Sequence, residues 1–371
     1  MVSILSSITG GRYELATVLP KKDYNSNNLV WLTIFVSFIS SFLLSVFIFI
    51  FHDNLEGLFQ DDILAWIFLV PLGVLSINIF NIFTYHNIRL KKYVDLSNSK
   101  IIKSVSLILI QASIGFFDKS VLGLFLGHIF SHLISSIKLF FNSLKNNLFK
   151  DISLKKMKDL SQKYSNFPKY DAPSSFLDIA SIQLPFLLII KIGGEIVSGN
   201  FFLASRVISI PSALLGQSMG QVYFQELNEA KNSSGASLNL LKNTLKKLII
   251  ISLPFTVLIY ILSPSLFPVI FGDKWIMGGK IAQYLAILFS IQLITVPVSS
   301  TLSLNRFIKR GAFVKVFKFL ILISIYTYGI FYRLEFFQFL LYLTIVQFSL
   351  YVIYLIVIIK SVYDIEKGLT N

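Results

Sequence analysis

The chain has 371 residues, of which 54% are hydrophobic and only 14% are charged, well below the roughly 25% charged residues of an average soluble domain. Its formal net charge is +14, and it contains no cysteine, so disulfides and thiol chemistry are excluded. This composition predicts a membrane-embedded protein rather than a soluble one.

Ten apolar stretches follow one another along the chain, each about as long as a helix needs to cross ~30 Å of hydrocarbon. Trp31, Trp66 and Trp275 lie at or near the ends of these stretches, where amphipathic rings prefer the interface. We therefore predict an all-α, polytopic transmembrane helix bundle. The predicted spans are 29–51, 62–85, 101–117, 120–142, 174–191, 199–222, 247–270, 276–302, 313–332 and 336–359.

The Lys and Arg residues are distributed unequally between the connections. One side holds 27 of the 33 basic residues, the opposite side holds five, and Arg206 lies inside a span. Short loops rich in Lys and Arg stay in the cytoplasm, so a multi-pass protein with both termini cytoplasmic is predicted. Anionic membrane lipids supply the counter-charge, and no nucleic-acid partner is implied. The basic connections are 11–28, 86–104, 138–172, 223–247, 303–318 and 360–371.

A long basic segment divides the predicted spans into two groups. Residues 1–142 are predicted to form a front lobe with the end of one span and four complete spans, and residues 174–360 a rear lobe of six. The segment between them, 143–173, is a basic cytoplasmic linker in which Leu154–Leu160 has the pattern of an amphipathic surface helix, and 361–371 is a cytoplasmic tail. Two helical lobes joined in this way are typical of a duplicated transporter.

The connections on the opposite side are very short, at 52–61, 118–119, 192–198, 271–275 and 333–335. An enzyme that acts on polysaccharide outside the membrane usually needs a sizeable external loop. The chain is therefore predicted not to be an enzyme.

Arg206 is the strongest candidate for a functional residue. It lies about seven residues inside its span, where a cation costs at least ~2–3 kcal/mol unless it is paired or faces water. At 100° per residue, Arg206, Ser209, Gln217 and Gln221 share one helix face. This stripe predicts a water-filled cavity in which Arg206 attracts an anionic substrate; the alternative is an arginine that snorkels outward or pairs with Glu195.

Other polar residues inside the membrane have weaker signals. Gln111 and Gln183 are candidate cavity residues, although a single glutamine in a span more often joins helices. Asp178, Glu195 and Lys191 are candidate coupling or structural charges. His128 and His132 share a helix face without a third ligand, so we predict helix-packing histidines and no metal site.

Three segments carry a family resemblance. Gly11–Pro20, with the sequence GRYELATVLP, resembles the cytoplasmic R-Y-E-x-A-x-x-L-P stretch of polysaccharide flippases in the multidrug/oligosaccharidyl-lipid/polysaccharide exporter superfamily. Phe167–Ile189 is similar to that family's F-P-x-Y-x-x-P-S segment, and Leu203–Glu226 to its A-x-R-V…Q-V-F-x-x-E segment. Their order and spacing match, and the resemblance covers essentially the whole chain.

The resemblance implies a function. Members of the family flip undecaprenyl-diphosphate-linked oligosaccharide repeat units across the bacterial cytoplasmic membrane for O-antigen, capsule or a similar polymer, by alternating access of two lobes. No cofactor is implied; a proton or sodium gradient is the expected driver. The polysaccharide polymerase and chain-length machinery are implied partners. The family has twelve spans with the R-Y-E stretch after the second, so this chain is expected to lack the first span and most of the second.

Three alternatives remain open at this point. A multidrug-type exporter of the same superfamily would share the fold and export free amphiphiles. A membrane polysaccharide polymerase or ligase would need a large external loop with catalytic residues. A structural membrane protein without transport activity would leave the Arg206 stripe unexplained.

The unequal distribution of basic residues generates a topological prediction. Reporter fusions within 145–165 and at the C-terminus are expected to report a cytoplasmic location, and fusions within 52–61 and 271–275 an external one. An external signal from 145–165 would overturn both the orientation and the two-lobe organisation.

Overall fold

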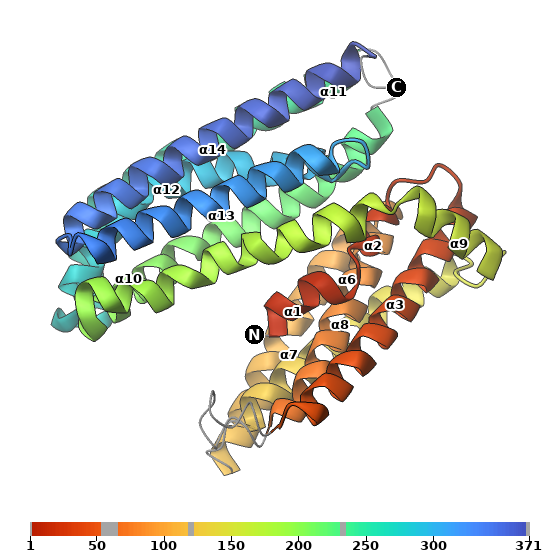
Figure 1. The fold of residues 1–371 in the computed structure, drawn as a ribbon, viewed down its shortest axis with the longest axis horizontal. Coiled ribbons are helices and arrows are strands. Elements are labelled where there is room, and N and C mark those ends of the chain that lie inside the picture. The colour runs from red at the N-terminus through yellow and green to blue at the C-terminus, as the bar shows by residue number, and fades with distance from the viewer. Residues whose placement is uncertain (1, 53–65, 118–121, 231–234, 369–371) are drawn as a thin grey trace. The chain divides into compact units, whose positions relative to one another are not determined.

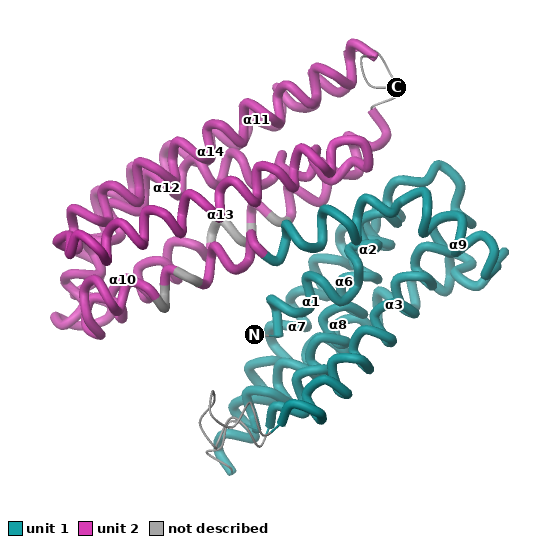
Figure 2. Tube along the Cα trace, in the orientation of Figure 1, with its two compact units in different colours: residues 1–176 teal, residues 177–371 magenta. Residues whose placement is uncertain are grey.

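The computed structural model describes residues 2–52, 66–117, 122–230 and 235–368. The side chains of residues 184, 186–187, 211–214 and 217 lie outside this description, as do most of the predicted connection 52–61 and all of 118–119. All regular secondary structure in the described ranges is helical (Figure 1). The chain forms two compact units, unit 1 of residues 1–176 and unit 2 of residues 177–371 (Figure 2).

Unit 1 is a bundle of long helices with short helices at its ends. The long helix α6 packs against both α3 and α8, and α8 also packs against α7, while the short α1 and α9 pack on α6 and α3 respectively. The elements are α1 (Val2–Thr9), α2 (Tyr13–Ala16), α3 (Asp23–Ile50), η1 (Ile67–Leu69), α6 (Val70–Arg89), α7 (Tyr93–Phe117), α8 (Leu122–Lys145), α9 (Leu154–Lys163) and the π-helix η2 (Phe167–Asp171).

Unit 2 contains most of α10 and four further long helices. Helix α12 packs against α11 and α14, and α14 also packs against α13. Its elements are α10 (Ala172–Ala230, which begins in unit 1), α11 (Ala236–Phe271), η3 (Asp273–Trp275), α12 (Ile276–Val298), η4 (Ser299–Ser303), α13 (Ile308–Phe331) and α14 (Phe336–Glu366).

Helix α10 consists of two helical arms joined at a glycine. Its 59 residues would extend ~88 Å as one straight helix, far more than the ~30 Å of a bilayer. Gly194 breaks it with φ 76° and ψ −176°, a conformation that only glycine adopts easily. Figure 1 shows the chain reversing direction at this break. The two arms correspond to the predicted spans 174–191 and 199–222.

The described helices confirm the predicted membrane bundle. Nine candidate spans are long and apolar enough to cross a membrane, and one of them, Leu188–Ile210, contains the Gly194 break. Several helices begin earlier than predicted: α7 begins at Tyr93 rather than 101, α11 at Ala236 rather than 247, and α13 at Ile308 rather than 313. The extensions are polar helical turns, which hydropathy alone does not count as part of a span.

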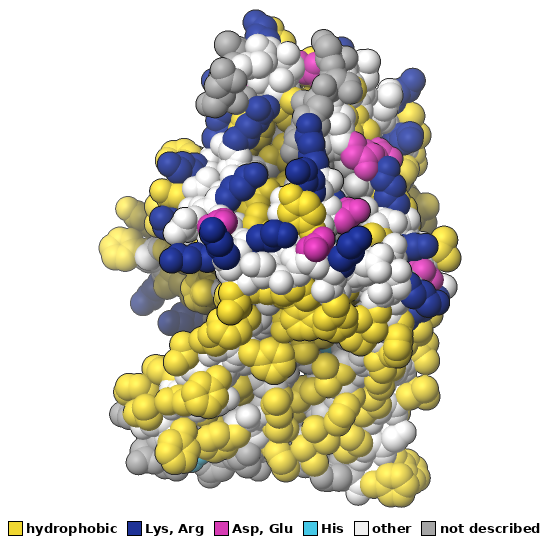
Figure 3. All heavy atoms as spheres, turned by 90° about the vertical axis from the view of Figure 1, so that its right-hand side faces the viewer, with side chains coloured by type: hydrophobic (Ala, Val, Ile, Leu, Met, Phe, Trp, Pro, Cys, Tyr) yellow, Lys and Arg dark blue, Asp and Glu magenta, His cyan; other side chains and the backbone are white. Residues whose placement is uncertain are grey.

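The surface has the character expected of a membrane protein. Phe42, Phe49 and Phe116 expose 67%, 76% and 83% of their surface, far more than large apolar side chains of a water-soluble bundle normally would. On the face shown in Figure 3, Lys and Arg side chains gather in one region, and the adjoining surface is covered by hydrophobic side chains. This separation of charged and apolar surface is typical of a helix bundle that spans a bilayer.

Helix ends in both units are closed by charged side chains. In unit 1, Arg89 donates hydrogen bonds to the carbonyls of Val18, Pro20 and Lys21 and pairs with Asp23, which ties the end of α6 to the start of α3. In unit 2, the Glu366 carboxylate accepts hydrogen bonds from the backbone N–H groups of Gly235, Ser237 and Leu238. A carboxylate at this position satisfies the free N–H groups of α11 and complements the helix dipole.

Candidate functional site

Two of the segments that carry the family resemblance contact each other in unit 1. Arg12 Nε donates to Asp171 Oδ2 at 3.0 Å, and Arg12 also pairs with Glu14 at 3.4 Å. The Tyr13 hydroxyl donates to the backbone carbonyl of Ser161 at 3.2 Å. The R-Y-E segment thus joins α2 to the chain just before α10, more than 140 residues later in the sequence.

The two carboxylates that pair with Arg12 are buried. Glu14 is 5% exposed and Asp171 is 3% exposed. Burial raises the pKa of the Glu14 carboxyl above its ordinary value, and the adjacent Arg12 acts in the opposite direction. Arg12 keeps its charge because two carboxylates face it. Arg12, Tyr13 and Glu14 therefore have a structural role in this chain, because their contacts hold one end of unit 1 together.

A second charge pair lies within the helices of unit 2. The Lys318 ammonium on α13 donates to Asp178 Oδ1 on the first arm of α10. The Lys318 side chain is 11% exposed and that of Asp178 is 33% exposed. Lys318 lies five residues inside the apolar span that begins at residue 313, which is ~8 Å along the helix axis. A cation at that depth is costly unless it is paired, and Asp178 supplies the partner.

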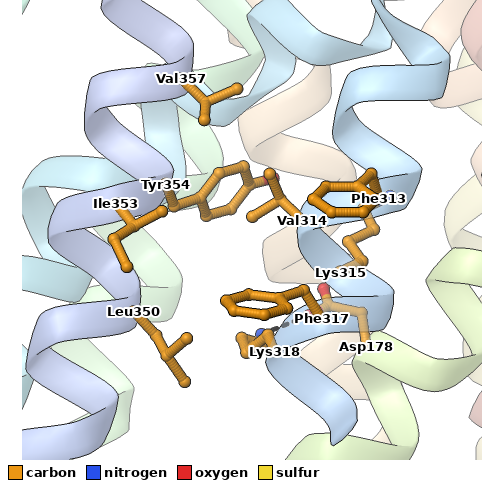
Figure 4. Close-up of a pocket in the computed structure, with 10 residues that line it drawn as sticks. All are labelled: Asp178, Phe313, Val314, Lys315, Phe317, Lys318, Leu350, Ile353, Tyr354 and Val357. Atoms are coloured by element: carbon orange, nitrogen blue, oxygen red, sulfur yellow. Dashed lines mark hydrogen bonds and ion pairs between the residues drawn. The ribbon is translucent and has the colours of Figure 1, made fainter. Parts of the chain in front are cut away.

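Aromatic and amide groups surround this pair. The Lys318 ammonium lies 5.5 Å from the centre of the Tyr351 ring of α14, and the Tyr351 side chain interacts with Gln292 of α12. Four helices of unit 2 thus contribute to one polar centre. Beside it is a cavity of about 110 Å³ between α13 and α14, lined mainly by apolar side chains (Figure 4). Figure 4 shows Lys318 and Asp178 pointing toward each other at one end of this cavity.

The Asp178–Lys318 pair could either stabilise the fold or take part in ion movement. A buried pair is weak evidence for stability, because desolvation offsets much of the attraction. Ionisable groups inside a membrane are instead typical of proton or ion pathways, where one partner exchanges its counter-ion during a cycle. The Asp178–Lys318 pair is therefore the candidate switch of this protein.

The structure distributes the other predicted residues over both units. Arg206 is exposed on the second arm of α10, and its carbonyl accepts a hydrogen bond from Ser209. Glu195 is also exposed, and no ion pair joins it to Arg206 in the part of the chain that the structure describes. Lys191 and Gln183 are exposed, and Gln221 is half-buried and has an interaction of its own. The Gln217 side chain lies outside the described residues.

Gln111 has a structural contact in unit 1. Its side-chain amide donates to the carbonyl of Leu124 on α8 at 3.4 Å, and the adjacent Gly127 leaves room for the Gln111 side chain. His132 likewise bonds the carbonyl of His128 one turn earlier. The Gln111 contact joins α7 to α8, and the His132 contact lies within α8.

Sequence reasoning missed Lys318. The predicted span 313–332 and the predicted basic connection 303–318 overlap at Lys318, and the distribution of charge assigns it to the connection. The structure places it inside α13, between the apolar residues Phe317 and Phe319. A lysine flanked by apolar residues inside a predicted span is a recognisable signal, and it becomes specific only when Asp178 is seen beside it.

Comparison of the fold with solved structures shows similarity to membrane transporters. An outward-facing multidrug resistance MATE family transporter of the MOP superfamily matches with a TM-score of 0.74 and 13% identity, over 98% of this chain and 86% of that one. A MOP superfamily transporter from Pyrococcus furiosus matches with a TM-score of 0.70, 12% identity and coverage of 98% and 86%. The bent form of the Vibrio cholerae MATE transporter VcmN matches with a TM-score of 0.66, 13% identity and coverage of 99% and 86%.

The chain is thus a multi-pass membrane protein with the fold of MOP superfamily transporters. A family model described as polysaccharide biosynthesis protein matches residues 15–277, well over half of the sequence. The chain belongs to this polysaccharide biosynthesis protein family. None of the curated protein sequences compared with the chain matches it significantly.

The Asp178–Lys318 pair generates a prediction about folding. Asp178→Asn leaves the Lys318 ammonium without a counter-charge, and we expect it to destabilise unit 2 by up to about 3 kcal/mol. Asp178→Leu combined with Lys318→Met removes both charges, so abundance in the membrane is expected to recover. Abundance and thermal stability in detergent measure both effects. A double variant less abundant than Asp178→Asn would contradict the pairing.

Proposed function

We propose that this protein flips an undecaprenyl-diphosphate-linked oligosaccharide across the bacterial cytoplasmic membrane for the synthesis of a surface polysaccharide such as O-antigen or capsule. The observation that carries the proposal is an exposed arginine, Arg206, inside an apolar helix of a chain that belongs to a polysaccharide biosynthesis family. The fold of MOP superfamily transporters supports movement of the cargo by alternating access.

The cargo has an anionic end and sugar hydroxyls, which suit Arg206 and the amides of α10 respectively. A diphosphate or an acidic sugar accepts paired hydrogen bonds from the planar guanidinium, and sugar hydroxyls pair with amides such as Gln221 and Gln183. Placing a cation inside an apolar span costs free energy. That cost is small for an exposed arginine only where it contacts water or an anion. Arg206 is therefore proposed as the site that binds the phosphate end of the cargo.

We assign the coupling step to Asp178 and Lys318. In the proposed cycle, a proton or a sodium ion competes with Lys318 for the Asp178 carboxylate, and the freed ammonium then turns toward Tyr351 or Gln292. The first arm of α10 and α13 are joined by this pair, so its opening loosens one helix contact within unit 2. A binding event of one cation is thus converted into a change of helix packing.

A multidrug-type exporter is the second candidate function. It is favoured by the likeness to MATE family folds, which shows the architecture and not the substrate. The two functions differ in cargo: an exporter of cationic amphiphiles would gain nothing from an exposed arginine, since like charges repel. Arg206 therefore favours the anionic lipid-linked cargo.

The first functional prediction concerns Arg206. In proteoliposomes with a fluorescent undecaprenyl-diphosphate-linked oligosaccharide, we expect Arg206→Ala to slow flipping by about ten- to a hundredfold, because a charge-assisted hydrogen bond contributes about 1.5–3 kcal/mol. Arg206→Lys is expected to be intermediate, since the charge remains and the bidentate fork is lost. The matched control is Lys274→Ala, which removes another exposed cation, in the short helix η3 between α11 and α12.

The amount of the Arg206→Ala protein in the membrane decides how its flipping rate is interpreted. Normal abundance with slow flipping supports a role in cargo binding. Wild-type flipping by Arg206→Ala would remove the residue from the mechanism. Unchanged glycan flipping together with altered efflux of a cationic dye would favour the exporter.

The second functional prediction separates coupling from structure. The variant Asp178→Leu/Lys318→Met is expected to be abundant and unable to accumulate cargo against a gradient, because no carboxylate remains to bind the driving ion. The control is Asp95→Leu/Lys138→Met, which removes the 2.7 Å ion pair between α7 and α8 in unit 1. Gradient-driven flipping at the wild-type rate by the Asp178/Lys318 variant would show that this pair is structural only.

A further inference from the structure

A basic cleft opens in unit 2 where α13 begins and α14 ends. Its volume is about 410 Å³, and it is lined by Lys309, Arg310, Phe313, Val314, Val357 and Lys360. Lys309 and Lys360 are exposed, and they come from two helices that contact each other. Three cations therefore converge at the mouth of one cleft.

The cleft keeps an excess of positive charge. Arg310 pairs with Asp364, whose side chain is 13% exposed, and also donates to the Ser361 hydroxyl. Arg306 precedes the cleft, and the guanidinium groups of Arg306 and Arg310 lie 4.7 and 5.2 Å from the centre of the Phe307 ring. Three of the six described residues that line the cleft are cationic and none of the six is acidic, which favours an external anion.

An apolar groove continues the cleft along the same two helices. The cavity beside the Asp178–Lys318 pair shares Phe313, Val314 and Val357 with the basic cleft. It then extends over Phe317, Leu350 and Ile353 (Figure 4). The Phe313 and Phe317 rings are stacked at 6.1 Å and are 70% and 40% exposed, so they form one wall that is open to the surroundings.

We infer that this continuous surface binds an anionic phospholipid of the surrounding membrane. Lys309 and Lys360 hold its phosphate together with Arg310, and an acyl chain lies in the groove along Phe313 and Phe317. Basic pockets between helices at the cytoplasmic interface suit anionic headgroups, and that is the side where these helix ends are predicted to lie.

The combination of a cationic mouth and an apolar groove selects this occupant. Free phosphate would use only the mouth and leave the exposed Phe313 and Phe317 uncovered. A zwitterionic lipid would fill the groove, but the positive group of its head would be repelled by the three basic residues. Only an amphiphile with a net negative head matches both parts, and the membrane holds such lipids at high local concentration.

The site also has a consequence for the neighbouring ion pair. Lys318 lines the deeper end of the groove, so an acyl chain there shields the Asp178–Lys318 pair from water and strengthens it. This consequence does not depend on which cargo the protein moves.

Lipid binding can be measured directly on the purified full chain. We expect native mass spectrometry to show one tightly bound phosphatidylglycerol, with affinity for phosphatidylcholine at least tenfold lower. Lys309→Gln/Lys360→Gln is expected to weaken phosphatidylglycerol binding at least fivefold, and raising the salt to weaken binding by the wild type. The matched control, Lys155→Gln/Lys158→Gln, removes two exposed lysines from α9 in unit 1.

The groove is tested by Val357→Phe, which narrows it without changing any charge. This variant is expected to weaken phosphatidylglycerol binding while inorganic phosphate remains unbound in both proteins. Equal binding of the two lipids, equal loss in the α9 control, or tight binding of inorganic phosphate would overturn the proposal. Preferential binding of undecaprenyl diphosphate over phosphatidylglycerol at this site would overturn the assignment of the occupant.

Discussion

The absence of hydrogen-bonding partners in hydrocarbon is the constraint on which the rest of this structure depends. Backbone N–H and C=O groups must be satisfied within each segment, and helices achieve this. The same requirement extends to hydroxyl side chains in the spans: Thr33 bonds the carbonyl of Leu29, and Ser106 bonds that of Ile102. Serine and threonine can therefore lie among apolar neighbours without a hydrogen-bond partner on another helix.

Longer polar side chains have more bonding groups than one backbone carbonyl can satisfy, and several of them reach a neighbouring helix. In unit 1, His86 on α6 bonds Ser143 on α8 at 2.8 Å, and Asn142 on α8 bonds Asp95 on α7 at 2.9 Å. In unit 2, Asn200 on α10 accepts the N–H of Gly278 on α12 at 2.8 Å. The Asp178–Lys318 pair differs from these contacts because both groups are charged and the carboxylate remains a third exposed. This exposure is what makes exchange of its counter-ion physically feasible.

The segments that resemble polysaccharide flippases divide into two physical classes. Arg12, Tyr13 and Asp171 are engaged with one another or with nearby backbone, so they hold the end of unit 1 together. Tyr223, in the third segment, bonds Thr301 at 2.9 Å and is buried. Arg206 lies in the same segment as Tyr223 and is exposed. Within these segments the buried contacts serve folding, and the exposed Arg206 is the residue for which we propose a role in binding.

The sequence by itself determined that the protein is a helical membrane bundle, because transfer of apolar side chains into hydrocarbon is a local property that a window of ~20 residues measures. It also located Arg206 and Asp178, since a charge within such a window is visible without a partner. Only the tertiary structure decided that Asp178 meets Lys318, 140 residues away, and that the R-Y-E segment closes on Asp171. It likewise placed the lysines of α13 and α14 around one cleft. Such pairings depend on which helix faces pack together, and no local average of hydropathy contains that information.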